Sequence, residues 1–113
     1  MRLNDIRISP HFKLREFQCG CCGTVKLRPE LIAMLEALRA LWGRPISLTS
    51  GYRCEQHNRA VGGASRSLHM AGRAADISAR PDEQKPLRLY AFDAGFTEVI
   101  CGEEKNYIHV GFN

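Results

Sequence analysis

The spacing of apolar residues along the chain predicts several helices, the clearest of which runs from Pro29 to Gly43. Proline is favoured in the first turn of a helix and glycine directly after its last turn. Between these two residues, apolar side chains recur at helical spacing, namely Leu31, Met34, Leu35, Leu38, Leu41 and Trp42. This stripe is typical of a helix that packs on a hydrophobic core, and nothing in it suggests a cofactor site.

Two further helices are expected later in the chain. One is short and covers residues 54–61. The other runs from Pro81 to about Ala94 and is followed by Gly95, but it contains Pro86. Because proline has no amide hydrogen and disrupts a helix interior, one interpretation is that the regular helix starts only near Lys85.

Short apolar segments with alternating or β-branched residues predict four strands, at residues 46–49, 74–77, 98–101 and 107–110. A polar turn joins the last two strands, and residues 11–17 have the pattern of a short amphipathic turn that docks the N-terminus. The expected fold is therefore α+β, with helices against a small, largely antiparallel sheet. At 113 residues, the chain is expected to form one domain, residues 1–113.

The charge and hydropathy of the chain narrow the range of partners. The formal net charge is +4, but the 16 Lys and Arg residues are scattered, so no nucleic-acid partner is expected. Anionic material such as a cell wall would be attracted equally well. The sequence has no apolar run long enough for a membrane span and no apolar signal-peptide core near its start. We therefore expect synthesis in the cytoplasm, with any external action following release by another route.

The chain has five cysteines, an odd number that argues against a complete disulfide framework. Cys19 and Cys22 have the C-x2-C spacing of a metal site, but a zinc ribbon needs a second such pair, and Cys54 and Cys101 stand alone. Small buried thiols or a disulfide, with Cys54 as a candidate partner, are the favoured interpretation. A metal site at the Cys19–Cys22 cluster remains open.

Three polar residues in apolar surroundings form a candidate catalytic centre. His69 and Asp76 are separated by Gly72, and a chain that turns at this glycine and enters a strand would let both side chains converge. Asp76 and His109 each lie in an apolar strand, where a carboxylate needs a cation to offset its desolvation. Two imidazoles and one carboxylate suit zinc and leave a fourth position for water. A buried His–Asp hydrogen bond beside an unrelated histidine explains the same spacing equally well.

An ordered set of motifs then makes the sequence recognisable: Ser50-Gly51-Tyr52-Arg53, His57-Asn58, Val61-Gly62-Gly63, Ser67-x-His69-x-x-Gly72-x-Ala74-x-Asp76 and Tyr107-Ile108-His109-Val110. Together these motifs resemble the family of zinc D-Ala-D-Ala carboxypeptidases and phage cell-wall endopeptidases, in particular its small single-domain branch. The resemblance covers nearly the whole chain. It implies the α+β fold shared with the hedgehog signalling domain, one catalytic zinc ion, a peptidoglycan peptide substrate and a monomer.

The resemblance also implies roles for individual residues. His69, Asp76 and His109 would be the zinc ligands, and Arg53 would face the substrate, where it stabilises an oxyanion or binds a carboxylate. Ser67 would form a hydrogen bond close to the metal and the substrate. His11 and His57 are expected to be structural.

One departure from the family pattern concerns the general base. Family members usually have a carboxylate three residues before the last histidine or two residues after it, where this chain has Asn106 and Gly111. Glu103 and Glu104 in the preceding turn are the nearest replacements, although a solvated turn explains them as well. If neither reaches the metal, the alternative is a zinc-stabilised binding module of the same fold without hydrolytic activity.

Overall fold

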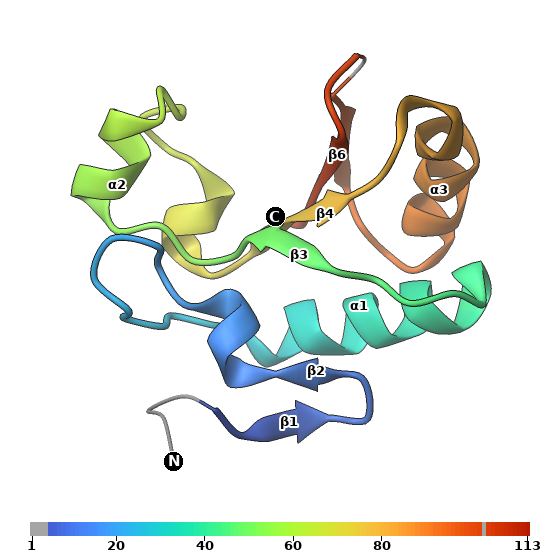
Figure 1. Cartoon of the computed structure of the whole chain (residues 1–113), viewed down its shortest axis with the longest axis horizontal. Helices are drawn as coiled ribbons and strands as arrows, with labels where there is room; N and C mark the ends of the chain where they lie inside the picture. Colours follow the sequence, from blue (N-terminus) through green and yellow to red (C-terminus); the bar gives the residue numbers. More distant parts are fainter. Residues whose placement is uncertain (1–4, 103) are drawn as a thin grey trace.

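The computed structural model describes residues 5–102 and 104–113 and has the expected α+β fold. Its helices are the α-helices α1, α2 and α3, and the 3₁₀ helices η1 and η2 (Figure 1). Their bounds are η1 Leu14–Phe17, α1 Pro29–Trp42, α2 Glu55–Ala60, η2 Leu68–Ala71 and α3 Pro81–Asp93. The strands are β1 Arg7–Ser9, β2 Phe12–Lys13, β3 Leu48–Ser50, β4 Ala74–Ser78, β5 Glu98–Cys101 and β6 Tyr107–Gly111. No helix in the described part of the chain has the length and apolar character needed to cross a bilayer.

The central sheet has four strands in the order β3-β4-β6-β5, and each neighbouring pair is antiparallel. All four of its strands were predicted from the sequence, with bounds that differ by at most two residues. The separate pair β1-β2 was not predicted, because its strands are only three and two residues long. Together with η1, this pair forms the N-terminal segment below α1 (Figure 1).

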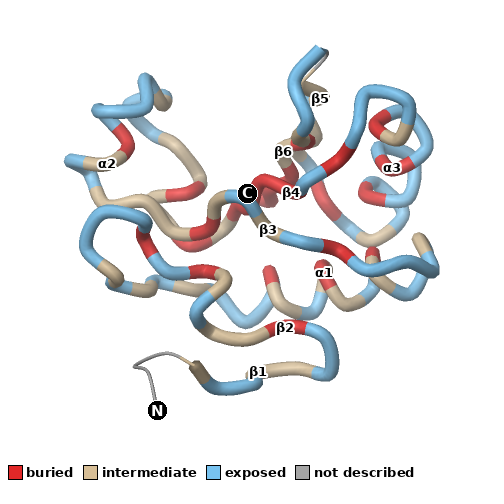
Figure 2. Tube along the Cα trace, in the orientation of Figure 1, coloured by how far each residue is buried: buried red, intermediate tan, exposed pale blue. Residues whose placement is uncertain are grey.

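The core lies between the helices and one face of the central sheet. Alternation along the strands directs Ile77, Ile108 and Val110 to this face, where they form one buried cluster with Leu35 and Leu38 of α1. Helix α3 contacts α1, β5 and β6, so α1 and α3 cover the sheet together (Figure 1). In Figure 2 the buried stretches accordingly lie along β4, β6 and the inner sides of both helices. The opposite face of the sheet carries the candidate functional site described below.

The helix ends follow the sequence signals, with one correction. Helix α1 begins at Pro29 and ends at Trp42, and Gly43 follows as the predicted cap with φ 71°. Helix α3 begins at Pro81 rather than near Lys85. Pro86 is tolerated because its missing N–H leaves only a carbonyl of the first turn without its helical partner. At the start of α3, the backbone N–H of Arg80 donates to the Glu83 carboxylate at 2.9 Å.

The N-terminal segment packs against the loop that follows β3. Phe17 is 1% exposed, and its carbonyl accepts a hydrogen bond of 2.8 Å from the Tyr52 N–H. A Cβ atom on Gly51 would lie 2.5 Å from the Phe17 Cα, so only glycine permits this approach. The docking role predicted for residues 11–17 is therefore confirmed, with Phe17 placed against the loop that carries Arg53.

Candidate active site

Strands β4 and β6 bring Asp76 and His109 together. The two residues are direct cross-strand partners in the antiparallel ladder, and such partners project from the same face of a sheet. Their neighbours Ile77 and Ile108 point to the opposite face and into the core. Alternation therefore buries the apolar side chains against the helices and leaves the carboxylate and the imidazole side by side.

His69 reaches the same point from η2. The Ser67 hydroxyl accepts a hydrogen bond of 3.2 Å from the His69 N–H and caps this short helix. Gly72 ends it with φ 70°, and a Cβ atom at Gly72 would lie 2.4 Å from the Lys26 carbonyl oxygen. The chain therefore turns sharply at glycine and enters β4, which leaves the His69 side chain only 2% exposed and beside Asp76.

The three candidate ligand atoms form a nearly equilateral triangle. His69 Nε2 lies 3.1 Å from Asp76 Oδ1 and 3.2 Å from His109 Nδ1, and His109 Nδ1 lies 3.1 Å from the same oxygen. Nitrogen and oxygen ligands of a tetrahedral zinc ion are roughly 3.3 to 3.4 Å apart. Very little movement would therefore let all three atoms share one ion.

The remaining nitrogen of each imidazole is held by the protein. His69 Nδ1 lies 2.7 Å from the Gly51 carbonyl oxygen, and His109 Nε2 lies 2.6 Å from Glu98 Oε1. Both partners are acceptors, so these nitrogens carry the hydrogens, and in neutral histidine the other nitrogens direct lone pairs toward Asp76. Three acceptors that face one point require a cation. This donor set therefore fits a metal ion, and carboxylate or carbonyl partners behind ligating histidines are typical of zinc sites.

The close packing of these groups shifts the pKa values of Asp76 and His109. Burial by itself raises the pKa of Asp76, but hydrogen bonds with His109 and His69 outweigh it and hold that pKa well below its usual range. Burial lowers the pKa of His109, whereas the carboxylates of Asp76 and Glu98 more than offset this effect and raise it. Without a metal ion, a proton on His109 can therefore serve as the cation, and metal binding must displace it.

Arg53 lies beside the metal ligands, with its side chain 15% exposed. Its guanidinium donates to Asp76 Oδ2 at 3.0 Å, to Ser50 Oγ at 3.2 Å and to Asn58 Oδ1 at 3.4 Å. Each guanidinium nitrogen thus has an internal partner, while one N–H on each terminal nitrogen is left over. The prediction that Arg53 faces the substrate needs an addition: this residue also holds Asp76 in place.

A cavity of about 440 Å³ opens over the triangle. All three candidate ligands line it, and so do the cationic side chains of Arg53 and Arg66. A cavity of this size lies in the range of small-molecule binding sites. Its arginines favour a substrate that carries a carboxylate.

Glu98 also lines this cavity, and sequence reasoning missed it. It lies directly across the β5–β6 ladder from Gly111, one of the two positions where a carboxylate was sought. Glu104, by contrast, is exposed in the turn beyond the paired ends of the hairpin and does not line the cavity, so the structure does not support it as the base. Glu103 lies outside the described residues.

The sequence matches the Peptidase M15 family over residues 10–111. The chain belongs to this family. Since the match covers all but the ends of the chain, the resemblance inferred from the motifs is confirmed.

Among curated proteins, the zinc D-Ala-D-Ala carboxypeptidase of Streptomyces albus G is 42% identical over 67 residues. This stretch is 58% of the present chain but only 26% of the relative. The chain therefore spans about a quarter of that protein's length. The name of this relative agrees with the zinc ion expected at His69, Asp76 and His109, whose donor atoms form one of the two candidate metal clusters among the described residues.

The histidines left out of the predicted ligand set of this Peptidase M15 chain lie elsewhere. His11 is exposed, and its Nδ1 lies 2.6 Å from the Glu36 carboxylate. His57 is in α2, where its backbone N–H donates to Cys54 Sγ at 3.4 Å. Neither belongs to the triangle that could hold the metal ion.

Proposed function

We propose that this chain is a zinc peptidase that hydrolyses amide bonds in the stem peptides of peptidoglycan. The observation that carries the proposal is the triangle of His69, Asp76 and His109 beneath a cavity lined by arginines. The substrate class is supported by the name of the Streptomyces relative and by the carboxylates that stem peptides carry, which complement Arg53 and Arg66. We further propose that the protein acts as a monomer at the cell wall after release from the cytoplasm.

When bound, the zinc ion would supply a water of lowered pKa and a Lewis acid for the scissile carbonyl. The protein's own residues do the rest. Glu98 fixes the His109 ring with Nδ1 toward the ligand triangle through its 2.6 Å hydrogen bond. As a carboxylate that also borders the cavity, Glu98 is our candidate for the group that accepts the proton of the attacking water. Arg53 keeps two N–H groups for a substrate oxygen, while its other bonds orient Asp76.

A second candidate function, a binding module without hydrolytic activity, is favoured by Asn106 and Gly111 at the two positions where the family usually has a carboxylate. The position of Glu98 opposite Gly111 argues against it, because a carboxylate on the neighbouring strand can occupy the space beside the last histidine. The peptidase therefore remains the better-supported proposal.

The deciding experiment incubates the zinc-loaded protein with defined muropeptides and follows the products by mass spectrometry. We expect loss of a terminal D-alanine if the enzyme is a carboxypeptidase, and separation of cross-linked stems if it is an endopeptidase. Asp76→Asn, which keeps the size of the side chain, should abolish either product, while Glu104→Gln should retain it. If the parent protein cleaves no stem peptide but still binds muropeptides, the binding module replaces the peptidase.

A further inference from the structure

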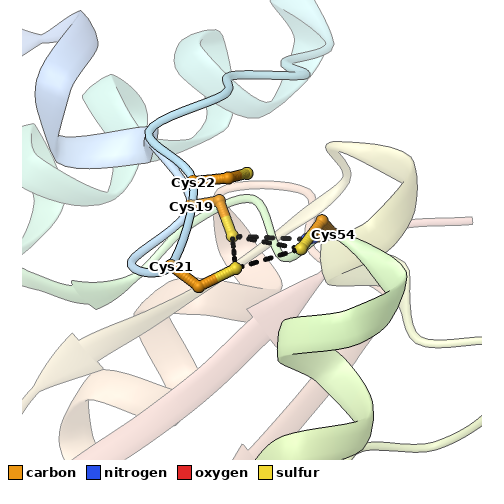
Figure 3. Close-up of side chains that lie close together, drawn as sticks. All are labelled: Cys19, Cys21, Cys22 and Cys54. Atoms are coloured by element: carbon orange, nitrogen blue, oxygen red, sulfur yellow. Dashed lines mark hydrogen bonds between the residues drawn. The ribbon is translucent and has the colours of Figure 1, made fainter.

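A second cluster of metal-binding side chains lies apart from the peptidase site. It combines three cysteines of one N-terminal turn with a fourth at the start of α2 (Figure 3). These residues are Cys19, Cys21, Cys22 and Cys54, and their sulfur atoms all lie within 4.8 Å of one another. The closest pairs are Cys21–Cys54 at 3.2 Å, Cys19–Cys21 at 3.5 Å and Cys19–Cys54 at 3.7 Å.

These separations fit a tetrahedral thiolate site better than the alternatives favoured from the sequence. A disulfide has a sulfur–sulfur distance of about 2.05 Å, and all four cysteines are free. Small buried thiols describe only Cys19, because Cys21 and Cys22 are exposed. In a tetrahedral zinc site with Zn–S bonds of about 2.3 Å, the sulfurs are roughly 3.8 Å apart. The three distances among Cys19, Cys21 and Cys54 are close to this value, and the Cys22 sulfur lies within 4.8 Å of these sulfurs.

The surrounding backbone prepares the sulfurs for negative charge. The Cys54 N–H donates to Cys19 Sγ at 3.5 Å, and the His57 N–H donates to Cys54 Sγ at 3.4 Å. Burial raises the pKa of the Cys19 thiol, but backbone N–H donors from Cys54, Cys21 and Cys22 outweigh it and lower that pKa to about 6. Hydrogen bonds with the sulfurs of Cys54 and Cys19 favour the protonated form of the Cys21 thiol and raise its pKa to about 12.

We propose that this cluster binds a second, structural zinc ion, with four thiolate ligands: Cys19, Cys21, Cys22 and Cys54. Four protein ligands leave no open position for water, so the site would not be catalytic. The ion would act as a cross-link between two segments, because Cys54 directly follows Arg53 and the other three ligands belong to the turn after Phe17. The ion would tie the N-terminal segment to the loop that presents Arg53 to the peptidase site.

Metal analysis of the full chain tests this proposal independently of hydrolysis. The protein is purified with a reductant that contains no thiol, saturated with zinc, desalted and analysed by mass spectrometry of the metal. We expect two zinc ions per chain in the parent and one in His69→Ala. A double variant, Cys21→Ser with Cys54→Ser, should also hold one. Cys101→Ser is the matched control and should hold two, because Cys101 lies outside the cluster.

Cobalt substitution identifies the ligands in protein that retains all its cysteines. Cobalt(II) bound to thiolates gives an intense charge-transfer absorption in the near ultraviolet, which histidine and aspartate ligands do not give. We expect this absorption in the parent and undiminished in His69→Ala, even if the protein cleaves no peptide. One zinc ion per parent chain, or cobalt-loaded parent without the thiolate absorption, would overturn the proposal.

Discussion

The hydrogen bond between Glu98 and His109 leads to the sharpest prediction. Glu98→Gln preserves the shape of the side chain but removes its charge, so His109 loses the carboxylate that fixes its ring. Loss of such a partner typically lowers metal affinity 10- to 100-fold. The Glu98 side chain is 41% exposed, and the glutamine oxygen can still accept from Nε2. We therefore expect the lower end of the range, about tenfold or ~1.4 kcal/mol.

Two measurements separate this positioning effect from a direct part in catalysis. In the first, a chromophoric chelator competes with the protein for the peptidase zinc ion. This ion is identified as the zinc equivalent that the parent binds and His69→Ala does not. The second is muropeptide cleavage at saturating zinc, where the loss of affinity is compensated. If Glu98 accepts the proton of the attacking water, turnover should still fall by about 10²-fold or more under these conditions.

Glu104→Gln is the matched control, since it makes the same chemical change on the exposed turn of the same hairpin. It should leave zinc affinity and turnover at the parent values. The reasoning is refuted if Glu98→Gln matches the parent in both measurements, or if Glu104→Gln is the variant that loses cleavage.

Three further variants and one control test the residues that support the site. His69→Ala should lose the peptidase zinc ion and roughly 2 kcal/mol of unfolding free energy, because Asp76 loses a partner; metal analysis that finds this site fully occupied would contradict the assignment. Arg53→Lys should reduce kcat/KM by roughly 30-fold, about 2 kcal/mol, and also lower Tm, since lysine cannot reproduce the planar guanidinium contacts; unchanged turnover would leave Arg53 only its structural role. Gly51→Ala should destabilise the fold by roughly 2 kcal/mol in chemical denaturation, since its Cβ atom would lie 2.5 Å from the η1 backbone. Gly20→Ala, with its nearest contact at 3.5 Å, should remain within 0.5 kcal/mol or so of the parent.

The elements were predictable because their signals are local, whereas local spacing only suggested the metal triangle and the family resemblance supplied its ligand set. Apolar spacing and the flanking Pro29 and Gly43 determine α1. Polar residues at alternate positions of apolar strands mark Asp76 and His109, and the glycine between His69 and Asp76 marks the turn. Each of these signals is local, and the longest is the helix between the flanking residues Pro29 and Gly43.

The missed features depend on contacts between distant parts of the chain. Glu98 precedes His109 by eleven positions and reaches it only through the register of the β5–β6 hairpin. A search for the nearest carboxylate in sequence therefore selected Glu103 and Glu104, whereas the pairing of strands places Glu98 beside His109. Cys54 likewise joins Cys19 across a separation of 35 residues, which spacing motifs do not encode.

The contact between Phe17 and Gly51 limits how far this protein can be trimmed. A shortened version that starts at α1 would retain every predicted ligand of the peptidase metal in its sequence. It would lack the Phe17 carbonyl that accepts from Tyr52 and the η1 backbone that lies against Gly51. The Gly51 carbonyl that orients His69 belongs to that same loop, so its position would no longer be supported from outside. For engineering purposes, residues 5–17 thus belong to the minimal unit, although none of them is part of the candidate metal triangle.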